Sequence, residues 1–232
     1  MCSLEKRGNI FILTLTGTDE HRLNPTLLNA IRSALRRVRS EASSSSALIT
    51  TAHGKFFSNG FDLAWAQAQT FEERMVFMTS LLRSVVTDLI SLPMPTISAV
   101  TGHASAAGCI LALSHDYVLM RSDRGFLYLS ELDIKIVFPP WCIALLKAKI
   151  GSPAARRELV MKAAKVTAKQ AVELRIIDSA HDNPEETVKA AVELGQGLVK
   201  RGWEGHVYAQ NRMAMLADVL DSTGATRTGS RL

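Results

Sequence analysis

Two acidic residues interrupt an apolar stretch in the middle of the chain. Glu131 and Asp133 lie within FLYLSELDIKIVFPPW, residues 126–141. A buried carboxylate is costly unless a cation such as Arg121 or Arg124 pairs with it, and without one its pKa rises. A carboxyl group with a raised pKa is suited to accept a proton near neutral pH. This segment therefore predicts either a buried ion pair or a base.

Two other stretches share one design, in which a strand is followed by a tight turn of small residues and then by a helix. They are KFFSNGFDL, residues 55–63, and TGHASAAGCIL, residues 101–111. The N–H groups in the first turn of a helix lack internal partners and lie at the positive end of the helix dipole. If the two turns face each other, they form a site for a negatively charged oxygen.

Structural explanations remain open for the same residues. Gly60 and the small residues 104–108 also suit a tight turn or close helix packing, and Asp62 also suits the start of a helix. Ser105 is a candidate nucleophile, but its surroundings lack the G-x-S-x-G pattern of a nucleophile elbow. The positions of His103 and Asp116 do not indicate a catalytic triad.

Composition favours a globular protein. The chain has 232 residues, of which 47% are hydrophobic, which fits one large domain or one domain with a helical appendage. Its apolar runs are far shorter than the ~18 residues of a membrane span, and its start, MCSLEKRGN, is too charged for a secretory signal. We therefore expect a soluble, intracellular protein.

Cysteine and histidine spacing predicts neither disulfides nor a metal site. Cys2, Cys109 and Cys142 are widely separated without CxxC spacing, and the six histidines are scattered. The net charge of +5 and the pI near 9.3 favour anionic partners. Basic residues gather in 31–39 and 147–157, which suits solvated helix faces or a small molecule that carries phosphate, and no nucleic-acid motif accompanies them.

The C-terminus carries a candidate targeting signal. Ser230, Arg231 and Leu232 differ from the peroxisomal address S-K-L by one basic residue, and they follow the polar stretch STGATRTG. We predict a flexible tail over 223–232 that a peroxisomal import receptor binds, and hence localisation in the peroxisome.

Strand and helix patterns alternate along the first two thirds of the chain, which predicts an α/β fold. The expected strands are 9–16, 47–52, 96–102, 116–122 and 176–179. One helix is expected to begin at Pro25. Further helices are expected over 71–92, 106–114, 139–150, 152–163, 167–174, 184–200 and 206–220.

Three motifs carry a family resemblance. FFSNGFDL, GHASAAGCILALSHDY and SELDIKIVFPPW resemble, in order and spacing, the crotonase (enoyl-CoA hydratase/isomerase) superfamily over residues 5–180. Within it the chain looks most like the plant peroxisomal Δ3,Δ2-enoyl-CoA isomerases. The resemblance implies a ClpP-like spiral of ββα units over 1–183 and a helical region over 184–222 that joins subunits into a homotrimer or homohexamer.

The resemblance also implies roles for individual residues. The backbone N–H groups of Phe61 and Ala107 would form an oxyanion hole, and Glu131 would be the catalytic base. Relatives that add water use two glutamates, and the first falls at Ile110, which cannot accept a hydrogen bond. Hydratase chemistry is therefore disfavoured. A double-bond shift from position 3 to position 2 needs one base, which moves a proton from C2 to C4.

The remaining implied contacts surround the acyl-CoA substrate. Residues expected to bind the substrate or its CoA portion are Arg22, Leu23, Ser58, Asn59, Gly60, Asp62, Leu63, Ile110 and Trp141. Asp133 could replace Glu131 if both lie on one face of a strand. Lys135 stands where several relatives have glycine, and it would lower the pKa of Glu131 if it pointed inward. The implied reaction requires no metal and no redox cofactor.

Three alternatives remain open. The chain could catalyse dienoyl-CoA isomerisation, which in relatives uses a further acidic residue, or thioester hydrolysis. It could also be a non-catalytic protein that binds acyl-CoA.

Overall fold

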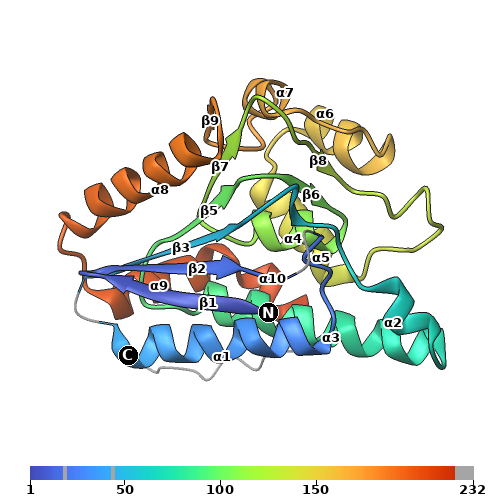
Figure 1. Cartoon of the computed structure of the whole chain (residues 1–232), viewed down its shortest axis with the longest axis horizontal. Helices are drawn as coiled ribbons and strands as arrows, with labels where there is room; N and C mark the ends of the chain where they lie inside the picture. Colours follow the sequence, from blue (N-terminus) through green and yellow to red (C-terminus); the bar gives the residue numbers. More distant parts are fainter. Residues whose placement is uncertain (18–19, 43–44, 223–232) are drawn as a thin grey trace.

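The computed structural model describes residues 1–17, 20–42 and 45–222, and in this part helices cover a central twisted sheet (Figure 1). The sheet has six strands in the order β1-β2-β3-β5-β7-β9. Only the pair β1 and β2 is antiparallel among its described pairs. The strands are β1 Cys2–Arg7, β2 Ile10–Leu15, β3 Ala47–Ala52, β5 Thr96–Val100, β7 Tyr117–Arg121 and β9 Ser179–His181.

A second, smaller sheet stands beside the first. Its three parallel strands are β4 Phe56–Ser58, β6 His103–Ser105 and β8 Leu127–Tyr128, in the order β4-β6-β8. The helices are α1 Pro25–Glu41, α2 Leu63–Gln67, α3 Phe71–Ile90, α4 Ala107–Leu113, α5 Pro140–Lys149, α6 Pro153–Arg156, the π-helical turn η1 Arg157–Met161, α7 Ala168–Glu173, α8 Pro184–Val199, α9 Gly205–Met215 and α10 Ala217–Ser222.

Both faces of the large sheet are buried at its central strands β2, β3 and β5, where alternate side chains point to opposite sides. Phe11, Leu13 and Leu15 of β2 pack into the main core with α1, α3 and α4. Ile10 and Ile12 point the other way, toward α8, which covers the second face (Figure 1). Hydrophobic burial against helices on both sides fixes the sheet as the frame of the molecule.

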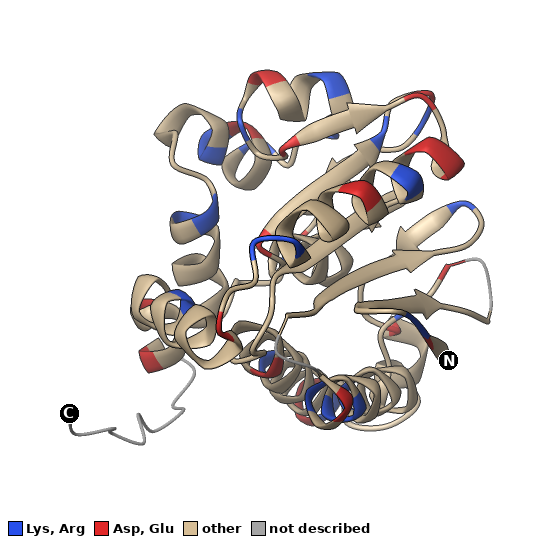
Figure 2. Cartoon of the chain, turned by 90° about the vertical axis from the view of Figure 1, so that its left-hand side faces the viewer, with Lys and Arg blue, Asp and Glu red and all other residues tan. Residues whose placement is uncertain are grey.

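The charged residues of α1 form a solvated and partly paired face. Arg32 contacts Asp88 at 3.0 Å, and Arg37 contacts Glu41 one turn further along α1 at 3.2 Å. In Figure 2 segments of both charge signs are interspersed along the helices seen from that side. The basic segment 31–39 is therefore an ordinary helix surface.

Most of the predicted elements are present, and the differences have local causes. The strand β3 has the predicted bounds, whereas Ile176 and Ile177 are buried turn residues and β9 starts at Ser179. The predicted helix 206–220 is divided into α9 and α10 at Leu216. The strand β1 was not predicted, because its charged sequence lies mostly exposed at the edge of the sheet.

The C-terminal helices pack against the rest of the chain. The helix α8 contacts β3, β5 and β7, and α10 contacts α5. The predicted role of 184–222 in joining subunits stays a prediction, and the predicted flexible tail, 223–232, lies outside the described residues. Among the described residues, no helix combines the length and apolarity needed to cross a membrane.

Candidate active site

The three strands of the small sheet end side by side and deliver the three motifs to one place. Strand β4 leads into Gly60 and Phe61, β6 leads into the first residue of α4, Ala107, and β8 leads into Glu131. Because the strands are parallel and adjacent, the segments that follow them leave from the same edge. Residues about 70 positions apart in sequence thereby share one site.

Glycines allow the first two segments to touch. A Cβ atom on Gly108 would lie 2.3 Å from the carbonyl oxygen of Ser58, which is shorter than any real contact. A Cβ atom on Gly60 would lie 3.0 Å from Cβ of Ala106 and 3.6 Å from the amide nitrogen of Ala107. Gly60 also has a φ of +76°, which favours glycine. The two strand-to-helix turns therefore face each other in direct contact.

The amide of Phe61 points away from the neighbouring chain segment. Leu23 donates to Gly60 O at 2.7 Å and accepts from Asp62 N at 3.1 Å, so the residues on both sides of Phe61 are bonded to it. Successive amides of an extended chain alternate in direction, and the Phe61 N–H therefore points to the opposite side.

The amide of Ala107 is the first of α4 and has no partner within its own helix. Ala106, before it, has a φ of +48°, a strained conformation for a residue with a Cβ atom. Ala106 N donates to Tyr128 O at 2.6 Å, which secures this turn to the strand that precedes Glu131. Within the part of the chain that the structure describes, neither the Phe61 nor the Ala107 amide donates a hydrogen bond.

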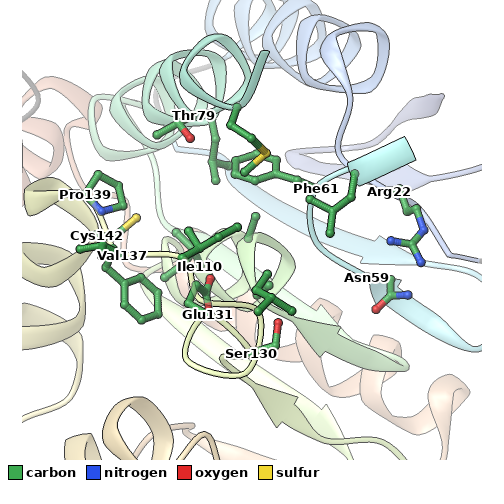
Figure 3. A pocket seen from close by; sticks show the side chains of 18 of the residues that line it. Arg22, Asn59, Phe61, Thr79, Ile110, Ser130, Glu131, Val137, Pro139 and Cys142 are labelled. Carbon is green, nitrogen blue, oxygen red and sulfur yellow. The ribbon is translucent and has the colours of Figure 1, made fainter. Parts of the chain in front are cut away.

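A cavity of about 210 Å³ opens beside these amides (Figure 3). Arg22 and Asn59 lie at one end, Phe61, Ile110 and Glu131 lie in the middle, and an apolar region lies beyond them. Ala107 also lines it. The cavity therefore has one charged and polar end, two free amides and a carboxyl group near its centre, and one apolar end.

Glu131 is the buried carboxyl group that its apolar surroundings predict. It is 8% exposed, and its Oε2 atom has no hydrogen-bond partner in the described structure. Burial raises its pKa from 4.5 to about 7, against a smaller lowering by its own backbone N–H. The alternative of an ion pair is wrong, since Arg121 binds Asp123 and Thr101 O instead and Lys135 is exposed.

Asp133 does not share the position of Glu131, because the segment that carries both residues is not a strand. Ile134 N donates to Ser130 O at 3.1 Å and Ile136 N to Glu131 O at 2.8 Å, which folds the segment into turns. Asp133 is exposed and accepts a hydrogen bond from the Tyr128 hydroxyl. Leu132, which stands between the two acids, is 50% exposed.

The other predicted contact residues divide into two groups. Those that line the cavity are Arg22, Asn59, Leu63, Ile110 and Trp141. Those that do not line it are Leu23, Ser58, Gly60 and Asp62. Leu23 and Ser58 are fully buried, and Ser58 donates to His21 O at 2.8 Å. Asp62 caps α2 by accepting from Trp65 N at 3.0 Å.

The family model described as Enoyl-CoA hydratase/isomerase matches residues 5–228. The chain belongs to the enoyl-CoA hydratase/isomerase family. It is 60% identical to "Enoyl-CoA delta isomerase 1, peroxisomal" of Arabidopsis thaliana over 99% of this chain and 96% of that protein. It is 50% identical to "Enoyl-CoA delta isomerase 2, peroxisomal" of the same plant, over 97% of this chain and 95% of that one.

Solved structures show that the fold is that of this family. Human mitochondrial delta3-delta2-enoyl-CoA isomerase superposes with a TM-score of 0.81 at 19% identity, over 96% of this chain and 90% of that one. The strands and helices of this chain are thus arranged in the spiral fold of the family. The predicted α/β fold is confirmed.

Several wall residues were not predicted as members of a family site. Met75, Thr79 and Leu82 line the cavity from α3, and Cys142 lines it from α5. The spacing of the α3 residues places them on one helix face. The same spacing is found on helix faces that pack into an ordinary hydrophobic core. The sequence alone therefore could not distinguish a cavity wall from a core face.

Proposed function

We propose that this protein is an enoyl-CoA delta isomerase that moves a cis or trans double bond from position 3 of a fatty acyl-CoA to the trans position 2. The reaction prepares unsaturated fatty acids for β-oxidation. One observation carries the proposal: a buried carboxyl group without a cation lines the same cavity as two unpartnered backbone amides. The names of the Arabidopsis relatives support it.

Glu131 acts as the single base. Its ionised carboxylate removes a proton from C2, and the electrons of that C–H bond delocalise onto the thioester oxygen. Glu131 then returns the proton to C4 as the double bond moves, so the carboxylate is regenerated. The pKa of about 7 keeps much of Glu131 ionised near neutral pH while leaving it basic enough to accept a carbon-bound proton.

The amides of Phe61 and Ala107 hold the negative oxygen of the intermediate. They are fixed by backbone contacts before the substrate binds, so they need no reorganisation during the reaction. Loss of one such donor typically raises the barrier by about 2.7–4 kcal/mol. The apolar cavity wall restricts water from competing for the charged intermediate.

Three other reactions of the family fit the cavity less well. Hydration requires a second group to hold water, and Ile110, beside Glu131 in Figure 3, offers no hydrogen bond. Dienoyl-CoA isomerisation in relatives uses a further acid, but Glu131 is the only acidic side chain among the described residues that line this cavity. Ile110 likewise provides no group to hold water for thioester hydrolysis.

The polar end of the cavity is suited to the CoA portion. Arg22 lies there, beside Asn59, and its side chain is 37% exposed and pairs with Glu20 at 2.5 Å. A phosphate of CoA can replace Glu20 as the partner of Arg22. Leu63 lies nearby on the path of the pantetheine arm.

The cellular setting follows from the same proposal. The protein acts in the peroxisome, as the names of its Arabidopsis relatives and the terminal residues 230–232 suggest, although those residues lie outside the described structure. An import receptor binds that tripeptide, and the subunits form a trimer or hexamer through 184–222. The reaction moves a proton without net oxidation, so it requires no redox cofactor, and the two amides stabilise the oxyanion that a Lewis-acid metal would otherwise hold.

The test compares Glu131→Gln with the wild type on 3-hexenoyl-CoA. The amide keeps the size of the side chain but cannot accept the proton, so we expect turnover to fall at least about a thousandfold. Binding of saturated hexanoyl-CoA, measured by calorimetry, should stay within about threefold. A wild type that binds acyl-CoA without turnover would favour the non-catalytic alternative, and a variant with near-normal turnover would exclude Glu131 as the base.

A further inference from the structure

The side chain of Asn24 bonds to the starts of two helices. Its oxygen Oδ1 accepts a hydrogen bond from Leu27 N at 3.0 Å and thereby caps α1. Its nitrogen Nδ2 donates to Oδ2 of Asp62 at 3.2 Å. The other oxygen of Asp62, Oδ1, accepts from Trp65 N at 3.0 Å and caps α2. One hydrogen bond between two side chains therefore joins the first turns of α1 and α2.

A second asparagine before a proline shows what a helix cap alone requires. Asn183 precedes Pro184, and its Oδ1 accepts from Glu186 N at 2.8 Å at the start of α8. An aspartate caps a helix about as well as an asparagine, but it has no donor group when ionised. The donor group of Asn24 is therefore not needed for the cap, and it holds Asp62 instead.

Helix α1 gives this bond a fixed origin. Leu28 and Leu35 of α1 are 0% and 1% exposed and pack into the main core. Helix α2 has only five residues, of which Ala66 alone is buried. The bond from Asn24 thus ties the short helix that follows Phe61 to a long helix that is anchored in the core.

The same contact borders a candidate oxyanion donor. The Phe61 N–H belongs to the peptide group whose oxygen, Gly60 O, accepts from Leu23 N at 2.7 Å. On the other side of Phe61, Asp62 N donates to Leu23 O at 3.1 Å, and the Asp62 side chain accepts from Asn24. The direction of the Phe61 amide is therefore fixed from both sides by residues 23 and 24.

We propose that Asn24 is a positioning residue for the reaction: its bond to Asp62 keeps the Phe61 amide directed at the thioester oxygen. The inference rests on the proposed function, in which this amide stabilises the oxyanion. Neither Asn24 nor Asp62 lines the cavity, so the two act through the backbone and not by contact with the substrate. Hydrogen bonds weaken when donor and acceptor are misaligned, so a small rotation of this amide slows the reaction.

Two variants break and restore the bond while both helix caps remain. Asn24→Asp keeps an oxygen for the cap of α1 but places a second carboxylate beside Asp62, which repels it. Addition of Asp62→Asn to this variant exchanges the two side chains. The amide at position 62 then donates to the carboxylate at position 24, and the net charge equals that of wild type. Asn183→Asp is the matched control, because it makes the same change at a helix start that does not line the cavity.

Steady-state kinetics on 3-hexenoyl-CoA give the first readout. We expect kcat to fall about tenfold in Asn24→Asp, which is less than the hundredfold or more that follows loss of an oxyanion donor. Binding of saturated hexanoyl-CoA should change less than about threefold, because the neutral thioester oxygen gains less from the amide than the oxyanion does. The exchanged pair should return kcat to within about threefold of wild type, and Asn183→Asp should leave it unchanged.

Infrared difference spectroscopy gives a second readout that does not depend on turnover. The carbonyl band of bound, isotope-labelled hexanoyl-CoA moves to lower frequency when amides donate to its oxygen. We expect about half of this shift to be lost in Asn24→Asp, since one of the two donors is misdirected, and to return in the exchanged pair.

The two readouts separate failure of this inference from failure of the proposed function. A wild type without the carbonyl shift, or an Asn24→Asp variant that keeps the full shift, would overturn the positioning role. An exchanged pair as slow as Asn24→Asp would do the same. A wild type that shows the shift without turnover of 3-hexenoyl-CoA would contradict the proposed function alone.

Discussion

Two carboxyl groups in this protein, one half-buried and one buried, have opposite surroundings. Asp116, which follows α4, accepts hydrogen bonds from Thr96 N at 2.9 Å, from Tyr208 at 3.2 Å and from Arg212 at 2.6 Å. Glu131 faces an apolar cavity, and its Oε2 atom has no partner among the described residues. One oxygen of Asp116 accepts several hydrogen bonds, whereas Glu131 has an oxygen that accepts none.

The two carboxyl groups have different roles: Asp116 holds the fold together, and Glu131 is available for chemistry. Arg212 also donates to the carbonyl oxygens of Ile90, Leu92 and Met94, so the Asp116 cluster fastens α9 to the chain before β5. All of the donors to Asp116 bind one oxygen, Oδ2, so this oxygen is engaged in holding the structure together. Glu131 keeps its basicity and its access to a substrate because the fold leaves it unpaired.

Removal of Arg212, the cation that binds Asp116, should give the largest change in stability. Arg212→Met leaves Asp116 and three carbonyl groups without their donor, and we expect the free energy of unfolding to fall by about 3–5 kcal/mol. Urea denaturation measures this. Tyr208→Phe, which removes one donor from the same carboxylate, should cost about 1 kcal/mol. Equal stability of Arg212→Met and wild type would show that the cluster contributes nothing.

Removal of the charge of Glu131 should stabilise the protein, and only at high pH. The folded-state pKa of Glu131 is raised from 4.5 to about 7, so its ionisation opposes folding, and this cost develops between those pH values. We expect Glu131→Gln to be more stable than wild type by about 3 kcal/mol at pH 8. The difference should vanish below pH ~4.5, where Glu131 is neutral in both states.

Thermal unfolding across pH provides the measurement. Glu158→Gln is the control, because Glu158 lies on the surface and pairs with Lys162. A stability difference for Glu131→Gln that does not change with pH would contradict a raised pKa.

A cation added near Glu131 should make it behave more like a paired carboxylate. For wild type, kcat/KM should rise with pH through a midpoint near 7, the pKa of Glu131, because the ionised form is the base. Ile134 lines the cavity and is 42% exposed, and we expect Ile134→Lys to lower the midpoint by about one unit. Leu132→Lys, at an exposed position that does not line the cavity, should leave it unchanged.

The smallest effect belongs to the second acid of the central segment. Asp133 is exposed and bound to the Tyr128 hydroxyl, so Asp133→Asn should reduce kcat less than about threefold, with the same midpoint in the pH profile. Steady-state kinetics on 3-hexenoyl-CoA measure both values. A loss as large as that of Glu131→Gln would make Asp133 the base.

The sequence was most informative where composition alone determines the physics. The apolar neighbours of Glu131 predict its raised pKa, and the small residues around Gly60 and Gly108 predict two closely packed turns. Asp133 could have replaced Glu131 if both lay on one face of a strand, but the backbone bond from Ile136 N to Glu131 O folds that segment into turns. Such a bond depends on the surrounding structure and leaves no periodic signal.

The small sheet also could not be predicted from the periodicity of hydrophobic residues. Its strands span three, three and two residues, which is too short for a repeating pattern. Their pairing depends on contacts between segments that are distant in sequence. Likewise, Thr79 and Cys142 became recognisable as wall residues only when α3 and α5 were placed beside the turn that carries Glu131.

The contact between Gly108 and Ser58 has a consequence for how this scaffold can diversify. Because main-chain atoms form the candidate anion site, substitutions at Ile110, Glu131 or Val137 alter the reacting group or the substrate without removing the amides that hold the oxygen. A descendant could thus acquire a new activity while it retained thioester recognition. Gly60 and Gly108 would be the positions where such drift is least tolerated.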